Sequence, residues 1–406
     1  MSAIGPTNGD VRNGASASPD AGISDEIIGR VQRRLVDRGE APRPQALAAA
    51  LRAESTVLMS DAEMLRLIRQ LQRELVGAGP LAELLADPST TDVVVNSPTD
   101  VRVDRGRGWE PASVRFTDDA AVQRLARRLA TAAGRRLDDA HPHVDARLTD
   151  GTRLHAVLAP IAASGTCLSL RVLRPVRHDL GALVEAGSLP GCSLPVVSAI
   201  LHARLALLVS GGTGSGKTTL LSALLAAVPP HERVVTVEDA EELRPPHPHV
   251  VRLVARQANV EGAGSISMRD LVRQALRMRP DRLVVGEVRG AEVVDLLAAM
   301  NTGHDGGAGT VHANTAVDVP ARLEALASLG GIGRAALHSQ LAGAVHVVLH
   351  VRRIGPRREL AEIAVLVRGS DGWVEAERAV VSGRPVEPGA SRLAELLADR
   401  GQARPW

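Results

Sequence analysis

The sequence predicts an α/β fold, in which a parallel sheet covered by helices follows a smaller α+β domain. From residue 206 onward, short apolar runs alternate with stretches of helical periodicity, and this alternation is typical of a parallel sheet. Upstream, valines at 93–95 and 101–103 surround a turn-like stretch, which indicates a separate group of strands. With 406 residues, 45% hydrophobic and 23% charged, the chain is long enough for two or three globular domains.

The pattern divides the chain into six segments. Residues 1–22 are polar, show no hydrophobic period and predict a disordered tail. A helical extension follows, in which Ser60 and Glu63 have the spacing of a capping box. The predicted segments after the tail are the helical extension 23–76, the α+β domain 77–174, a linker 175–183, the α/β domain 184–370, and a carboxyl-terminal tail 371–406 with a short helix.

Composition argues against several classes of protein. Cys167 and Cys192 lack metal-ligand spacing, so we expect no zinc site, and so few cysteines favour a reducing compartment. No signal peptide and no apolar run of bilayer length are visible, which predicts a cytoplasmic protein that contacts membranes through partners. The net charge of +2 gives no indication of a nucleic-acid-binding surface. The pairs His141/His143 and His247/His249 have no supporting ligands nearby in sequence, so a metal site there is not expected.

A glycine-rich run between an apolar strand and a helix carries the strongest chemical signal. The run GGTGSGKTT matches G-x-x-x-x-G-K-[ST], a loop whose backbone N–H groups surround phosphates. Lys217 is the only lysine in the chain, and it would bridge the β- and γ-phosphates, while the Thr218 hydroxyl would bind Mg²⁺. The predicted Mg-ATP-binding residues are Gly211, Gly212, Thr213, Gly214, Ser215, Gly216, Lys217, Thr218 and Thr219.

Charged side chains follow three further predicted strands, at the edge where α/β sheets bind ligands. Glu238 ends the strand at 234–237 and could orient or deprotonate a water, or it could belong to a solvated acidic turn. Glu287 ends the strand at 283–286, and its carboxylate would act on Mg²⁺ through water. His312 follows a third strand and could reach the same edge or serve as a structural histidine, and His304 lies before that strand.

Taken in order, four motifs resemble the type II/IV secretion ATPase superfamily, and the resemblance is nearest to the Tad/Flp pilus assembly ATPases. The motifs are GGTGSGKTT, VTVEDAEEL, RMRPDRLVVGEVRG and MNTGHDGGAGTVHANT, and the likeness extends from about Gly79 to Leu349. The resemblance implies a RecA-like P-loop domain that hydrolyses ATP. It also implies Glu238 as general base, Glu287 as the Walker B carboxylate and His312 near the γ-phosphate.

The same resemblance implies a homo-hexamer at the inner membrane, held there by platform proteins of a pilus or secretion system. It assigns phosphate contacts to Arg153 and Arg171, which could instead be solvated surface arginines. Two rival functions remain open. A DNA-translocating RecA-like ATPase of the conjugation type shares the glycine-rich motif, but the balanced charge and few aromatics argue against it. A non-hydrolysing nucleotide-binding scaffold is the other, and Glu238 and Glu287 argue against that.

Overall fold

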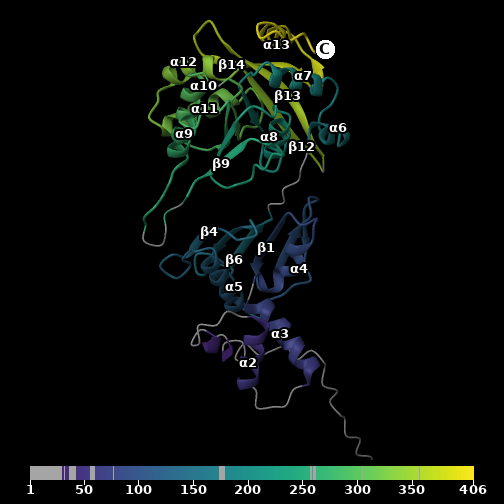
Figure 1. Cartoon of the computed structure of the whole chain (residues 1–406), viewed down its shortest axis with the longest axis vertical. Helices are drawn as coiled ribbons and strands as arrows, with labels where there is room; N and C mark the ends of the chain where they lie inside the picture. Colours follow the sequence, from purple (N-terminus) through teal and green to yellow (C-terminus); the bar gives the residue numbers. More distant parts are fainter. Residues whose placement is uncertain are drawn as a thin grey trace, which may run out of the picture. The chain divides into compact units, whose positions relative to one another are not determined.

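The computed structural model describes residues 30–31, 33–35, 43–54, 60–75, 77–172, 179–256, 258, 262–303, 305–355 and 357–406. The chain divides into two compact units, Met1–Val172 and Leu173–Trp406 (Figure 1). The predicted tail 1–22 lies outside the described residues, as does the first part of the predicted linker. From Asp179 onward the predicted linker is helical, because the Asp179 carboxylate caps the next helix by accepting the Ala182 N–H at 2.7 Å.

The first unit contains a six-stranded antiparallel sheet and a small set of helices. Its strands, in the sheet order β3-β2-β1-β6-β5-β4, are β1 (Asp92–Ser97), β2 (Asp100–Asp104), β3 (Trp109–Pro111), β4 (His143–Arg147), β5 (Arg153–Val157) and β6 (Cys167–Arg171). Its helices are α2 (Pro44–Glu54), α3 (Asp61–Leu75), η1 (Gly79–Leu81), α4 (Ala82–Ala86) and α5 (Asp119–Ala132). The predicted α+β character is confirmed by this arrangement.

Two hydrophobic clusters stabilise the first unit. In β1 and β2 alternate residues are buried, and they pack with the apolar face of α5 in one cluster. The other cluster joins α2 and α3 through Leu47, Leu51 and Leu71. The predicted capping box at the start of α3 is confirmed, since Ser60 N donates to Glu63 Oε2 at 2.9 Å and Glu63 N to Ser60 Oγ at 3.3 Å.

The second unit is built on a nine-stranded mixed sheet with strand order β15-β14-β13-β12-β7-β11-β10-β8-β9. Its strands are β7 (Leu207–Ser210), β8 (Val234–Glu238), β9 (Val250–Val254), β10 (Arg282–Val288), β11 (Ala308–Val311), β12 (Val347–Ile354), β13 (Arg357–Arg368), β14 (Val374–Val381) and β15 (Arg384–Pro385). The six strands from β12 to β9 are parallel, and β13, β14 and β15 extend the sheet antiparallel. This confirms the α/β, RecA-like architecture predicted from the alternation of strands and helices.

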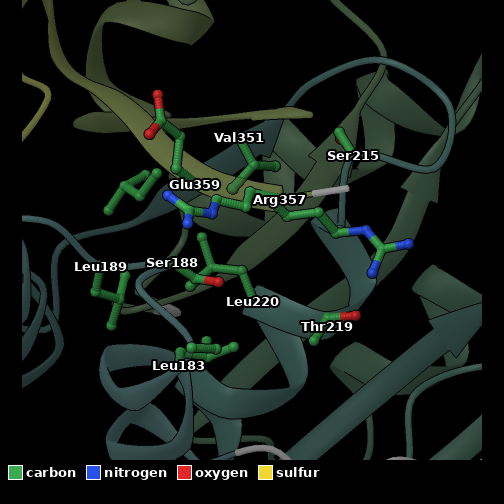
Figure 2. Close-up of a pocket in the computed structure, with 13 residues that line it drawn as sticks. Leu183, Ser188, Leu189, Ser215, Thr219, Leu220, Val351, Arg357 and Glu359 are labelled. Carbon is green, nitrogen blue, oxygen red and sulfur yellow. The ribbon is translucent and has the colours of Figure 1, made fainter. Parts of the chain in front are cut away.

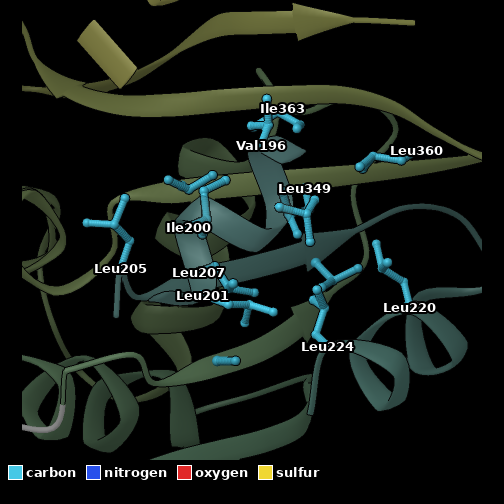
Figure 3. Packing of buried hydrophobic residues seen from close by; sticks show 14 of the residues in the cluster. Val196, Ile200, Leu201, Leu205, Leu207, Leu220, Leu224, Leu349, Leu360 and Ile363 are labelled. Carbon is cyan, nitrogen blue, oxygen red and sulfur yellow. The ribbon is translucent and has the colours of Figure 1, made fainter. Parts of the chain in front are cut away.

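Helices cover both faces of this sheet. They are α6 (Leu180–Glu185), α7 (Ser193–His202), α8 (Lys217–Ala226), α9 (Met268–Leu276), α10 (Glu292–Met300), α11 (Val319–Leu329), α12 (Arg334–Ala344) and α13 (Gly389–Ala398). Because strand side chains alternate between faces, Leu207 and Val209 pack with α7 and α8, whereas Leu208 packs with α10 and α11. Figure 3 shows the first of these two cores, with residues of α7 and α8 against β7, β12 and β13.

The carboxyl-terminal region differs from the prediction. The sequence suggested a tail from residue 371 with a short helix, but β14 pairs with β13 along most of its length and α13 packs its leucines into the first core. The apolar residues Val374, Ala376, Ala379 and Val380 of β14 are buried, whereas Glu375 and Arg378 are exposed. The strand was not predicted because many of the residues of β14 are glutamates and arginines, which are not typical of strands.

The parallel register aligns the ends of four strands at one edge of the sheet. Ser210 is the register partner of Val311, and Val311 of Val288, while Val285 pairs with Val237. The residues that follow or end these strands therefore emerge side by side, at the carboxyl edge where such sheets bind ligands.

We expect Leu349→Ala to lower the free energy of unfolding of the second unit by about 2–5 kcal/mol, because it leaves a void in a fully buried position of β12. Ile354→Ala is the matched control, since Ile354 lies in the same strand and is 49% exposed. Urea unfolding followed by circular dichroism measures both. Equal effects of the two substitutions would contradict the placement of β12 at the centre of the core.

Candidate functional site

A glycine loop, residues 211–216, connects β7 to α8 at the carboxyl edge of the second sheet. Gly214 and Gly216 have φ of +68° and +100°, which other residues rarely adopt. A Cβ at Gly211 would lie 2.3 Å from the Val351 carbonyl oxygen and 2.6 Å from Ser215 Oγ. Two of these glycines are therefore required by backbone conformation, and Gly211 by the close approach of β12.

Lys217 lies in the first turn of α8, and its ammonium group binds to the glycine loop. Lys217 is 8% exposed, and its Nζ donates to the carbonyl oxygens of Gly211 at 3.0 Å and Gly212 at 2.9 Å. Burial lowers the pKa of Lys217, and the negative charge of Glu287 opposes this shift. A group so placed can exchange the loop carbonyls for phosphate oxygens with a short movement of its side chain.

Glu287 and His312 meet beside Lys217. His312 Nε2 lies 2.6 Å from Glu287 Oε1, and both ring nitrogens of His312 are 3.4 Å from Lys217 Nζ. Burial lowers the pKa of His312, as does the Lys217 charge, so the imidazole is favoured in its neutral form. The structure thus brings together three residues that the sequence predicted, whereas His304 lies outside the described residues.

Arg289 connects Glu287 of β10 with Asp239, which follows β8. This role of Arg289 was not predicted from the sequence. Its Nη2 donates to Glu287 Oε2 at 2.6 Å and its Nη1 to Asp239 Oδ2 at 3.1 Å. Burial raises the pKa of Glu287, but the hydrogen bond and charge of Arg289, together with the charge of Lys217, bring it below its ordinary value. Glu287 is therefore an anion at neutral pH.

Glu238, predicted as a general base, is buried at the end of β8 and is 2% exposed. Its Oε1 accepts the backbone N–H groups of Glu242 at 3.0 Å and Leu243 at 2.9 Å, which fixes the following turn. Burial raises its pKa to about 7, although these two hydrogen bonds favour the anion. A Cβ on Gly286 would lie 2.6 Å from Glu238 Cγ, so the glycine makes room for this carboxylate.

Glu242 is the carboxylate that reaches the predicted metal ligand. Thr218 Oγ1 lies 3.4 Å from Glu242 Oε2, across the gap between α8 and the turn that Glu238 holds. In the sequence, Glu242 belongs with Glu238 to the stretch that could be a solvated acidic turn. A signal was available, because Glu242 lies four residues beyond Glu238 at the end of a predicted strand, but spacing alone did not separate it from Glu241.

These residues fit Mg²⁺ and a triphosphate. The Thr218 hydroxyl and the Glu287 carboxylate are oxygen donors of the kind that Mg²⁺ prefers, and the Glu242 carboxylate lies beside the Thr218 hydroxyl. The buried Ser215 hydroxyl has no hydrogen-bond partner in the described part of the chain, and a phosphate oxygen in the glycine loop would supply one. In the described part of the chain, no group of three His, Cys, Asp or Glu side chains is placed so that it could hold a metal ion.

Arg153 and Arg171 lie in the first unit, on neighbouring strands. They are register partners in β5 and β6, and Arg147 of β4 is the register partner of Arg153, so three arginines form a row on one face. Arg171 Nε donates to Asp92 Oδ1 at 3.0 Å. Phosphate contacts by Arg153 and Arg171 stay a prediction, and Arg147 is a neighbour that the sequence did not single out.

Comparison with known proteins places this geometry in a family. Residues 74–383 match the family model described as type II/IV secretion system protein, which spans both units. The chain belongs to this family. No helix in the described part of this family member combines the length and apolar character needed to cross a bilayer.

Three relatives illustrate the likeness of this type II/IV secretion family member. A "putative conjugal transfer protein" of Mycobacterium tuberculosis is 60% identical over 353 residues, which are 85% of this chain and 100% of the relative. Protein VirB11 of Agrobacterium fabrum is 32% identical over 320 residues, 70% of this chain and 91% of VirB11. The VirB11 ATPase from the Brucella suis type IV secretion system, solved in complex with sulphate, is 26% identical, with 70% of this chain and 95% of that chain covered and a TM-score of 0.38.

We expect Glu238→Gln to change how stability depends on pH. The folded-state pKa of Glu238 is about 7 against 4.5 in the unfolded chain, so its stabilising contribution is complete below pH 4.5 and is lost as pH rises through 7. The variant should therefore gain unfolding free energy relative to the wild type between pH 5 and pH 8, by up to ~3 kcal/mol. Urea unfolding across this range measures the difference, and a constant difference would contradict the buried, protonated carboxyl.

Proposed function

We propose that the protein is an ATP-hydrolysing motor of a secretion or pilus assembly system. The observation that carries the proposal is the convergence of Lys217, Glu287 and His312 on the glycine loop. Family membership supports it, as does the 32% identity with Protein VirB11 of Agrobacterium fabrum. The reaction is the hydrolysis of ATP to ADP and phosphate.

In this mechanism the chain binds the triphosphate and orders the groups around its terminal phosphate. Lys217 leaves the loop carbonyls and binds the β- and γ-phosphates, and the Thr218 hydroxyl and the Glu287 carboxylate would hold Mg²⁺. The bound cation would neutralise charge that develops on the transferred phosphoryl group. Neutral His312, held by Glu287, can donate or accept a hydrogen bond at the γ-phosphate.

Two carboxylates are candidates for the base that activates water. The sequence-based proposal is Glu238, and a pKa near 7 suits a base at neutral pH. The geometry supports a different division of labour, in which Glu242 at Thr218 activates the water and Glu238 holds the turn through the Glu242 N–H. We favour Glu242 because one oxygen of Glu238 is already committed to two backbone donors.

Paired variants separate these assignments. We expect Glu242→Gln to lower kcat by ~10²-fold or more while ATP binding persists, because a base is lost and the fold is kept. Glu238→Gln should keep kcat within ~10-fold, since an amide oxygen still accepts the two N–H groups. Phosphate release and equilibrium ATP binding are the measurements, with Lys217→Ala as the variant that should lose both. The opposite order of the two glutamine variants would restore Glu238 as the base.

The single lysine provides a second, activity-independent test. An amine-reactive reagent can modify only Lys217 and the terminal amine, because no other lysine is present. We expect Mg-ATP to protect Lys217 from modification while the terminal amine reacts at an unchanged rate. Mass spectrometry of the peptide that contains Lys217 measures protection. Equal labelling with and without nucleotide would contradict the assignment of Lys217 to the phosphates.

The proposal extends to the oligomeric state of the protein and to its position at the membrane. We propose a homo-hexamer in the cytoplasm, held peripherally at the inner membrane by platform proteins of a Tad/Flp-type pilus or a related export system. In such a ring Arg153 and Arg171 would reach a nucleotide and neutralise charge at the transferred phosphoryl group. Dependence of ATPase activity on protein concentration, and its loss in Arg153→Ala and Arg171→Ala without loss of folding, would support this role.

A conjugation-type, DNA-translocating ATPase is the second candidate. The specific observation in its favour is that the relative with 60% identity is named a "putative conjugal transfer protein". Salt-dependent DNA binding accompanied by several-fold stimulation of ATP hydrolysis would favour this function over protein export. The net charge of +2 gives no independent support for DNA binding.

A further inference from the structure

A buried hydrogen bond joins β7 to β12 one residue before the glycine loop begins. Ser210 Oγ lies 2.9 Å from His350 Nδ1, and the exposed fractions of Ser210 and His350 are 0% and 4%. The two residues are register partners, and they form the last pair of the parallel ladder between the two strands. Because a polar group at this depth is costly without a hydrogen-bond partner, each of these side chains stabilises the other.

Directly after this pair, β12 and the glycine loop stay in close contact. A Cβ at Gly211 would lie 2.3 Å from the Val351 carbonyl oxygen. These two residues directly follow the hydrogen-bonded pair in β7 and β12. Val351 of β12 and Ser215 of the glycine loop also line the same pocket (Figure 2). The hydrogen bond between Ser210 and His350 therefore holds the two strands together at the point where the glycine loop begins.

A third strand adds a carboxylate to this pair. Glu362 of β13 is the register partner of His350, so the side chains of Ser210, His350 and Glu362 point to the same face of the sheet. These three residues form a polar row. Burial lowers the pKa of His350, and the negative charge of Glu362 opposes this shift only in part, so the imidazole is favoured in its neutral form. Glu362 Oε1 lies 3.2 Å from Arg378 Nε, an ion pair that fixes the carboxylate in place.

The other oxygen of Glu362 reaches the segment between β11 and α11. Glu362 Oε2 accepts the Ala316 N–H at 3.3 Å, and Ala316 lies four residues beyond His312. The glycine loop and the segment after β11 also meet at the site itself, where a ring nitrogen of His312 is 3.4 Å from Lys217 Nζ. The polar row therefore connects the same two segments a second time, across β12 and β13.

We propose that His350 is a positioning residue for the nucleotide site, an inference that rests on the proposed function. Through Ser210 it holds the start of the glycine loop, and through Glu362 it is linked to the segment that carries His312. A loop that is already held in its binding conformation loses less freedom when phosphates bind, so the polar row favours nucleotide binding. The link through Glu362 fixes His312 relative to the glycine loop, and a reaction at the γ-phosphate depends on such a fixed geometry.

The first test removes the buried hydrogen bond from either side. Ser210→Ala and His350→Leu each delete one partner, whereas His350→Asn places an amide group where the imidazole has Nδ1. Calorimetry measures the binding of Mg-ATP to the full chain, and mass spectrometry measures how fast an amine-reactive reagent modifies Lys217 without nucleotide. We expect Ser210→Ala and His350→Leu to weaken Mg-ATP binding and to speed Lys217 modification by ~3–10-fold, the effect of one hydrogen bond. His350→Asn should stay within ~2-fold of the wild type.

A double variant and a destabilised control distinguish positioning from a general loss of stability. Combining Ser210→Ala with His350→Leu should change both quantities no more than the stronger single variant does, because both substitutions remove the same hydrogen bond. Leu393→Ala is the control, since Leu393 is fully buried on α13, which packs against β13 and β14. It should lower the free energy of unfolding and leave Lys217 modification unchanged.

A second test addresses the link through Glu362. Glu362→Ala removes the acceptor of the Ala316 N–H, whereas Glu362→Gln keeps an oxygen that can accept it. We expect Glu362→Ala to lower kcat for ATP hydrolysis by ~3–10-fold with little change in KM, because His312 is then held less firmly beside the bound nucleotide. Glu362→Gln should retain kcat within ~2-fold of the wild type. A rise in KM at unchanged kcat would contradict this link.

Unchanged Mg-ATP binding and Lys217 modification in Ser210→Ala and His350→Leu, or an equal rise in modification in Leu393→Ala, would overturn the positioning role. If the wild-type chain did not bind Mg-ATP, the proposed function would fail, whereas the rates of Lys217 modification would still test whether His350 holds the glycine loop. Ser210→Ala removes one oxygen atom, so it provides the test if His350→Leu fails to fold, with circular dichroism as the check.

Discussion

The functional site of the second unit depends on one constraint, the burial of the Lys217 ammonium group. Lys217 is nearly removed from water, and an unpaired charge in that position would be costly. The loop carbonyls and the anionic Glu287 offset this cost, and Glu287 in turn is balanced by Arg289. Alternating charges therefore extend from α8 across β10 to Asp239 at the end of β8, and each member depends on its neighbour.

This chain of charges suggests how a triphosphate would act on the site. Phosphate oxygens would take the Lys217 ammonium from the loop carbonyls and would add negative charge beside Glu287. The balance among Glu287, Arg289 and His312 would then shift, and these residues lie at the ends of two strands, β10 and β11. A change of ligand at the glycine loop would therefore alter the charge interactions along this edge of the sheet.

Local sequence patterns predicted the parts of the molecule that depend on local physics. The glycine loop, the capping box of Ser60 and the positions of Glu287 and His312 at the carboxyl ends of strands follow from backbone conformation and from sheet geometry. The role of Glu242 depends on how a turn is folded back by Glu238, and the position of Arg289 depends on two strands meeting. Such tertiary contacts leave no periodic trace, and β14 was missed because charged residues occupy its outer face.

The contact between Gly286 and Glu238 has a consequence for how this site can change. A methyl group at position 286 would occupy the space of the Glu238 side chain, so the two positions are coupled in volume. An alanine at 286 would be compatible with a shorter acid at 238, and a glutamate at 238 demands the absence of a side chain opposite. Across homologous sequences the residues at positions 238 and 286 should therefore vary together, with a larger residue at one position accompanied by a smaller residue at the other.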